Sequence, residues 1–112
     1  MSVSFKGFNE NIITFKAENG ISSGSAVKMS GSGTVSACSD GDIFCGFAVD
    51  CGSGYAAVQL CGAVTANYSG AAPAVGYSAL VSDGSGVKAS ESGREYLVVA
   101  VDESVGTVTF IM

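Results

Sequence analysis

The four cysteines are the side chains of this sequence with the widest chemical range, because a thiolate can bind a metal, form a disulfide or act as a nucleophile. They are Cys38, Cys45, Cys51 and Cys61. No two have the close spacing of a zinc knuckle, and the chain has no histidine to complete a metal site or activate a thiolate. We therefore expect free, partly buried thiols that pack as small apolar side chains, with Cys51 the most exposed. Disulfide pairing among them stays open, although a reducing cytoplasm disfavours it.

Asp50 and Asp102 occupy equivalent positions in two similar segments, as the two carboxylates of an acid protease would. Such a protease needs Asp-Thr/Ser-Gly at each site, whereas this chain has Asp50-Cys51-Gly52 and Asp102-Glu103-Ser104. An aspartate at the end of a strand more often accepts hydrogen bonds from the backbone of the following turn. We expect turn chemistry at both positions.

Two glycine motifs match the loose dinucleotide fingerprint, Gly52-x-Gly54-x-x-Ala57 and Gly84-x-Gly86-x-x-Ala89. That fingerprint binds a pyrophosphate only where a helix follows, and each motif here leads into a strand-like segment. Both are expected to be turns. With no paired nucleophile and base and no metal cluster, the sequence predicts no catalytic, cofactor-binding or metal-binding residue and a protein that is not an enzyme.

The chain repeats itself at an offset of about 52 positions, which indicates two copies of one structural unit. Nine identities carry the match: Gly24/Gly76, Ser30/Ser82, Val35/Val87, Ala37/Ala89, Gly41/Gly93, Ala48/Ala100, Val49/Val101, Asp50/Asp102 and Gly54/Gly106. Coincidence is the alternative, because a chain rich in Gly, Ser, Ala and Val matches itself easily.

Each copy contains a predicted β-hairpin whose register places apolar side chains on one face. In the second hairpin the expected pairs are Val101 with Val108, Val99 with Phe110 and Leu97 with Met112. In the first they are Val49 with Ala56, Phe47 with Val58 and Cys45 with Leu60. This register leaves Gly52-Ser53 as a two-residue turn in the first hairpin. In the second, Ser104-Val105 is poor turn chemistry and predicts a longer or bulged loop.

The composition favours an all-β fold. Glycine accounts for 16 of 112 residues, there is one proline, and only 13% of the residues are charged. Gly/Ser turns separate short runs of Val, Thr, Tyr and Phe, a pattern typical of about eight to ten short strands. We expect a single β domain over residues 1–112, a small antiparallel barrel or sandwich built from two pseudo-repeated hairpin units. Residues 1–20 would form an N-terminal arm and strand, 24–60 repeat one, 61–75 a connection, and 76–112 repeat two.

The charge distribution argues against nucleic acid and membrane surfaces as partners. The formal net charge is −5, and the five cationic residues are dispersed along the chain. Phosphate or anionic lipid binding requires clustered cations. The N-terminus has no apolar export segment, so we expect a product that is made and kept in the cytoplasm until something assembles around it.

Several segments resemble the phage capsid cement, or head-decoration, family of small β proteins. The resemblance is carried by Gly24-Ser25-Ala26-Val27-Lys28-Met29, Thr34-Val35-Ser36-Ala37 and Phe44-Cys45-Gly46-Phe47-Ala48, and later by Gly76-Tyr77-Ser78-Ala79-Leu80 and Thr107-Val108-Thr109-Phe110-Ile111. It spans most of the chain from Gly20 onward. The chain departs from the family's pattern in its cysteine content and at Val98-Val99-Ala100, where the second repeat lacks the glycine.

The resemblance implies a structural protein that binds the outside of an expanded phage head and stiffens the shell. Its partner would be the major capsid protein, its location the virion surface, and its self-association commonly trimeric. It brings no catalytic residues. From its broken alternation, the segment Met1 to Asn11 is expected to be an arm that reaches a neighbouring subunit. The alternatives are another phage structural component, such as a tail or adhesion protein, a ligand-binding β module, or a small enzyme that uses Asp50 and Asp102.

Overall fold

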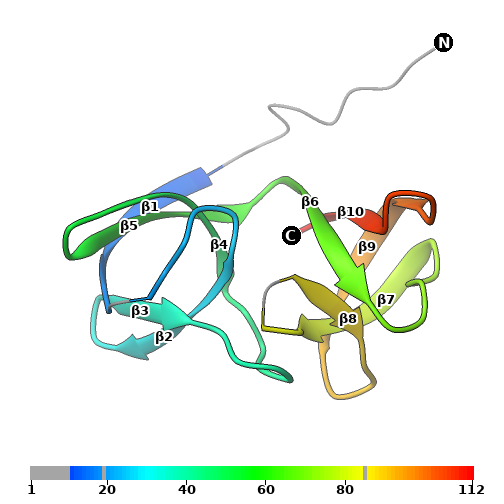
Figure 1. Cartoon of the computed structure of the whole chain (residues 1–112), viewed down its shortest axis with the longest axis horizontal. Helices are drawn as coiled ribbons and strands as arrows, with labels where there is room; N and C mark the ends of the chain where they lie inside the picture. Colours follow the sequence, from blue (N-terminus) through cyan, green and yellow to red (C-terminus); the bar gives the residue numbers. More distant parts are fainter. Residues whose placement is uncertain (1–10, 19, 85) are drawn as a thin grey trace, which may run out of the picture.

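The described residues contain ten β-strands, which fold into two five-stranded barrels, one from each half of the chain (Figure 1). The structure is a computed structural model and describes residues 11–18, 20–84 and 86–112. The first barrel contains β1 (Asn11–Ala17), β2 (Ala26–Gly31), β3 (Thr34–Ala37), β4 (Gly46–Gly52) and β5 (Tyr55–Cys61). The second contains β6 (Ala63–Ser69), β7 (Gly76–Ser82), β8 (Val87–Ala89), β9 (Arg94–Asp102) and β10 (Thr107–Ile111).

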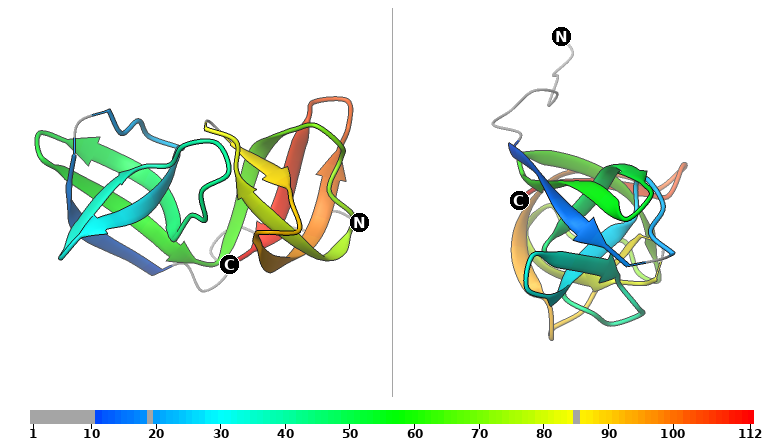
Figure 2. Two further views of the ribbon diagram at one scale, coloured as in Figure 1. Left: turned by 90° about the horizontal axis from the view of Figure 1, so that it is seen from below. Right: turned by 90° about the vertical axis from the view of Figure 1, so that its left-hand side faces the viewer.

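The all-β class and the two similar units predicted from the sequence are confirmed. In each barrel the first strand runs parallel to the third and antiparallel to the fifth, and the second strand joins the third to the fourth. A hairpin of the fourth and fifth strands completes each ring. The two barrels therefore have one topology, and they lie side by side along the long axis of the molecule (Figure 2).

The segment 61–75, expected to be a connection, contains the strand β6. This strand stands at the repeat offset from β1, so each repeat begins one strand earlier than predicted. Its alternation is weak in the sequence because Ala63 and Ala66 carry little apolar signal. The strand is instead specified by β10, which pairs with it from Thr107 opposite Asn67 to Ile111 opposite Ala63. Only residues 70–75 remain as the connection to β7.

The predicted register of the second hairpin is correct near its turn and wrong beyond it. Val108 lies opposite Val101 as expected, but the register shifts between Thr109 and Phe110. Phe110 consequently pairs with Val98, and Leu97 pairs with Ile111. The shift is a β-bulge at Val99, an additional residue of β9 that has no partner of its own on β10. Strict alternation in the sequence does not reveal such an insertion. The turn is longer than two residues, as expected.

The predicted register of the first hairpin is wrong throughout. Ala56 lies opposite Cys51 and Val58 opposite Ala48, and β4 begins only at Gly46, after Cys45. The turn consists of Ser53-Gly54, because Gly54 adopts a φ of +79° that a side-chain-bearing residue rarely adopts. Gly106 has a φ of +81° at the equivalent position, which explains why the repeat keeps glycine there.

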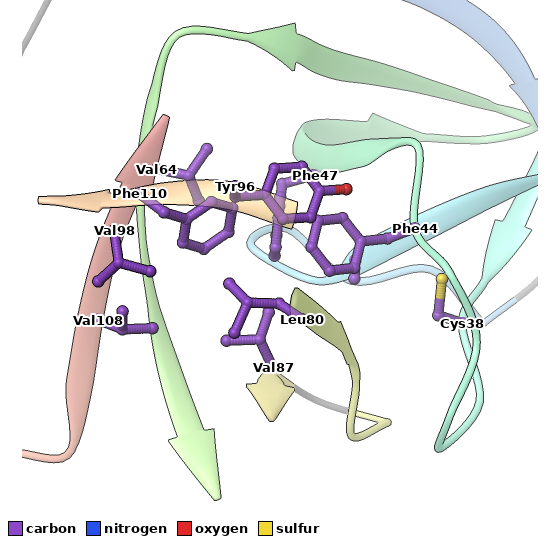
Figure 3. Close-up of a cluster of buried hydrophobic side chains, with 11 residues drawn as sticks. Cys38, Phe44, Phe47, Val64, Leu80, Val87, Tyr96, Val98, Val108 and Phe110 are labelled. Carbon is purple, nitrogen blue, oxygen red and sulfur yellow. The ribbon is translucent and has the colours of Figure 1, made fainter. Parts of the chain in front are cut away.

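The buried side chains form two hydrophobic clusters, one of which contains residues from both halves of the chain. The interior of the first barrel is formed by Val27, Val35, Ala48, Ala56 and Val58. A second cluster fills the other barrel, with Val64, Leu80, Val87, Tyr96, Val98, Val108 and Phe110, and it also includes four residues of the first half, Ala26, Cys38, Phe44 and Phe47 (Figure 3). Burial of the Phe44 and Phe47 rings among residues of the second barrel joins the two repeats into one packed body.

Residues 38–45, the connection between β3 and β4, attach the first barrel to the second, and we call them the docking loop. Gly41 donates its backbone N–H to the Ser82 carbonyl oxygen at 2.8 Å, and Ser82 donates to the Asp42 carbonyl oxygen at 2.9 Å. Lys88 forms an ion pair with Asp40 at 2.7 Å. The Phe44 ring of this loop is 1% exposed among residues of the second barrel.

Candidate interaction surfaces

The two aspartates of the predicted carboxylate pair are not brought together. Asp50 lies within β4 of the first barrel, and Asp102 ends β9 in the second. The β4–β5 and β9–β10 turns lie at opposite ends of the molecule (Figure 1). Two carboxylates must be close to share a proton, so this arrangement provides no acid-protease chemistry.

The expected turn chemistry is present at Asp102 and missing at Asp50. The Asp102 carboxylate accepts hydrogen bonds from the Ser104 hydroxyl at 2.6 Å, the Ser104 N–H at 3.1 Å and the Val105 N–H at 3.3 Å. These hydrogen bonds lower the pKa of Asp102, and the one from the Ser104 hydroxyl has the largest effect. Asp50 pairs with Ala57 and is therefore set back from the turn, and within the described residues its carboxylate has no hydrogen-bond partner.

None of the four cysteines forms a disulfide with another described residue. Cys38 is buried in the cluster between the barrels, and Cys45, Cys51 and Cys61 are half-buried, so Cys51 is not distinguished by exposure. Burial raises the pKa of the Cys38 thiol to about 11 and also raises that of Cys45. Within the described residues no group of three or more His, Cys, Asp or Glu side chains could hold a metal ion.

Alkylation at pH 8 is expected to modify Cys38 most slowly in the folded protein. A pKa of about 11 in place of 9.0 reduces its thiolate fraction about 100-fold at this pH, and burial hinders the reagent further. Peptide mass spectrometry after timed iodoacetamide treatment would measure each site, with the urea-denatured chain as control. Equal folded-state rates at Cys38 and the half-buried Cys51 would contradict the burial of Cys38.

The two glycine motifs form loops, as expected. Gly54 lies in the β4–β5 turn, and Gly84 and Gly86 lie between β7 and β8. Each motif is followed by a strand, so neither presents the helix N-terminus that a pyrophosphate requires. No helix among the described residues has the length and apolarity needed to cross a membrane.

An ion pair between Lys28 on β2 and Asp42 in the docking loop holds this loop in position. Lys28 Nζ lies 2.7 Å from Asp42 Oδ2, and the same carboxylate oxygen accepts the Ser39 N–H at 2.8 Å. The hydrogen bond from Lys28 lowers the pKa of Asp42, and Asp42 in turn raises the pKa of Lys28. Since the pair is partly exposed, its role is to orient the loop that carries Phe44 rather than to supply much stability.

Two grooves lie where the halves of the chain meet. One of about 460 Å³ is lined by glycine and hydroxyl groups, from Gly20 and residues 22–25 together with Ala37, Asn67 and Gly84. The other, of about 310 Å³, is more apolar and is lined mainly by Phe47, Ala48 and Val49 of the first barrel and residues 63–65 of the second. The described residues that line the two grooves are all uncharged.

An apolar row crosses the outer face of the second barrel. Tyr77 on β7 pairs with Leu97 on β9, and Leu97 pairs with Ile111 on β10. Tyr77 is 74% exposed and Leu97 is 37% exposed, and Val75, just before β7, is also exposed. Contiguous exposed apolar side chains of this kind typically mark a site of protein–protein contact. Sequence reasoning does not single out this row, because the periodicity of a strand does not say which face meets a core.

Comparison with family models, curated proteins and solved structures finds no match to this chain.

Proposed function

We propose that this chain is a non-enzymatic structural protein that binds the outside of a phage head and stiffens the shell, with the major capsid protein as its partner. The observation that carries the proposal is the outward apolar row in which the exposed Tyr77 and Leu97 are continued by the half-buried Ile111, side chains of the kind that dock on another protein. The resemblance of the sequence to the cement family supplies the identity of the partner.

The joined barrels support a mechanical role. A protein that stiffens a shell must transmit force without bending, and here Phe44 and Phe47 of one barrel are buried in the core of the other. Backbone hydrogen bonds between the docking loop and Ser82 add a directional link. Close packing of this kind resists movement of one half against the other.

Co-sedimentation with empty, expanded heads of the phage from the same source tests this function. The wild-type protein is expected to pellet saturably at a fixed ratio to the capsid subunit. Leu97→Glu and Tyr77→Glu would each place a charge in the apolar row, and each is expected to weaken binding at least about tenfold. Val105→Glu is the matched control, because Val105 is 69% exposed in the β9–β10 turn, away from the row.

Absence of pelleting by a folded wild-type protein would overturn the capsid function. Equal binding by Leu97→Glu, Tyr77→Glu and Val105→Glu would instead show that the row is not the docking surface.

A second candidate is a ligand-binding module, favoured by the groove of about 460 Å³ between the halves. Its glycine, serine and asparagine lining suits a small uncharged polar ligand such as a sugar, held by hydroxyl and backbone groups. Glycan-array screening of the intact chain would test this. A hit abolished by Asn67→Ala would favour the second candidate over the first.

A further inference from the structure

One edge of β1 lies open at the surface of the first barrel. β1 pairs with β5 from Asn11 to Lys16, but it pairs with β3 only at Lys16 and Ala17. The Ala17 N–H points to β5, where it donates to Gly54, and the Lys16 N–H points the other way, to Gly33. Since the backbone alternates along a strand, Ile12 and Thr14 direct their N–H and C=O groups away from β5. No strand of the described chain pairs with them there.

The side chains around this open edge are apolar on both faces of the strand. Ile12 is 51% exposed and Ile13 is 48% exposed, and the two point to opposite faces. The stretch Asn11-Ile12-Ile13-Thr14-Phe15 contains no charge and no proline. Sheet edges that remain solvent-exposed are normally protected by lysine, proline or an inward charge, because an unprotected edge pairs with another chain. The described part of this edge has no such protection between Ile12 and Thr14.

We propose that two copies of this chain associate by antiparallel pairing of their β1 strands across a twofold axis at Ile13. In this register Ile12 of one copy lies opposite Thr14 of the other, and each pair exchanges two backbone hydrogen bonds. The N–H and C=O groups of Ile12 and Thr14 in each copy then all have hydrogen-bond partners. Within the described residues, centring the axis on residue 12 or 14 instead would form only one such pair, because Lys16 already donates its N–H to Gly33. The axis at Ile13 forms two.

The side chains fit the same register. Ile13 faces Ile13 of the second copy in a non-hydrogen-bonded pair, where side chains approach most closely, and Ile12 packs beside Thr14 on the other face. A second copy is therefore the occupant whose backbone pattern and apolar faces match the open edge.

This pairing is independent of capsid binding, because it uses β1 of the first barrel and not the apolar row of the second. It is also distinct from a trimer at a symmetry axis, since a twofold pairing closes after two copies. A test on the purified chain alone therefore succeeds or fails separately from the proposed function.

Sedimentation equilibrium of the full chain over about 1–100 µM, a range suited to a modest interface, measures the association. The wild type is expected to reach the mass of a dimer. Ile13→Lys would set two cations against each other at the axis and is expected to weaken dimerisation at least about tenfold. Met29→Lys is the matched control, because Met29 is 47% exposed on β2, and it should leave the association unchanged. Circular dichroism would establish that both variants are folded.

Cysteine cross-linking tests the register itself. Ile13→Cys would place two thiols opposite each other on the axis and is expected to give an oxidised dimer, above the background of the wild type with its four thiols. Ile12→Cys would place them diagonally, about 7–8 Å apart, too far for a disulfide. A wild type that stays monomeric, a trimer insensitive to Ile13→Lys, or equal cross-linking at both positions would overturn the proposal.

Discussion

Phe44→Ala is expected to lower the free energy of unfolding by about 3–5 kcal/mol, because it removes the ring at the centre of the contact between the barrels. The Phe44 ring stacks on Tyr96 with the centroids 5.2 Å apart and the planes 9° from parallel. Its centroid also lies 5.0 Å from that of Phe47 and 6.1 Å from that of Phe110 (Figure 3). Urea denaturation followed by tyrosine fluorescence and circular dichroism would measure the loss.

The matched control is Phe15→Ala, which removes the same side chain from a half-buried position packed against the core of the first barrel. Its cost should be clearly smaller. Phe44→Leu keeps most of the buried volume and should recover part of the stability, which guards against a Phe44→Ala protein that does not fold. If Phe44→Ala cost less than about 1 kcal/mol, the typical effect of an ordinary substitution, the ring would not join the barrels.

Gly93→Ala is expected to destabilise the protein by about 3 kcal/mol, at the upper end of the cost of overpacking. A Cβ at this position would overlap the backbone of Leu80, with the carbonyl carbon at 2.6 Å and the nitrogen at 2.9 Å. Since a backbone cannot rotate aside as a side chain can, β7 and β9 would have to separate at the pair of Leu80 with Arg94. Thermal unfolding by calorimetry would measure the change.

Gly31→Ala is the control for this prediction. A Cβ at Gly31 would meet only the Thr34 Cβ, at 3.9 Å, and the φ of Gly31 is not in the left-handed region. Its effect should stay within about 1 kcal/mol of the wild type, because alanine there mainly restricts the unfolded chain. Equal losses from Gly93→Ala and Gly31→Ala would mean that the close approach of Leu80 is not what requires glycine.

The identical residues Gly41 and Gly93 illustrate how one sequence signal covers two physical causes. Gly41 has a φ of +89° with open space where a Cβ would stand, so its backbone conformation requires glycine. Gly93 is required instead by the approach of Leu80. The repeat showed that both positions matter, but only the packed structure separates the two reasons.

The sequence by itself determined the local features of this protein. Glycine and serine turns, short β-branched runs and the constant repeat offset are properties of neighbouring residues, and they predicted an all-β chain of two similar units. The absence of histidine and the wide cysteine spacing likewise follow from the letters alone. These predictions needed no knowledge of which segments meet.

The tertiary structure decided everything that depends on distant partners. A β-bulge shifted the register of the second hairpin, because a bulge is set by the curvature that closes a barrel and not by alternation along one strand. The first hairpin differs already at its turn, which closes one residue later than predicted. The strand β6 exists because β10 pairs with it. The loop residue Phe44 became a core residue because the second barrel surrounds its ring, a contact that spans the two repeats and leaves no periodic trace in the sequence.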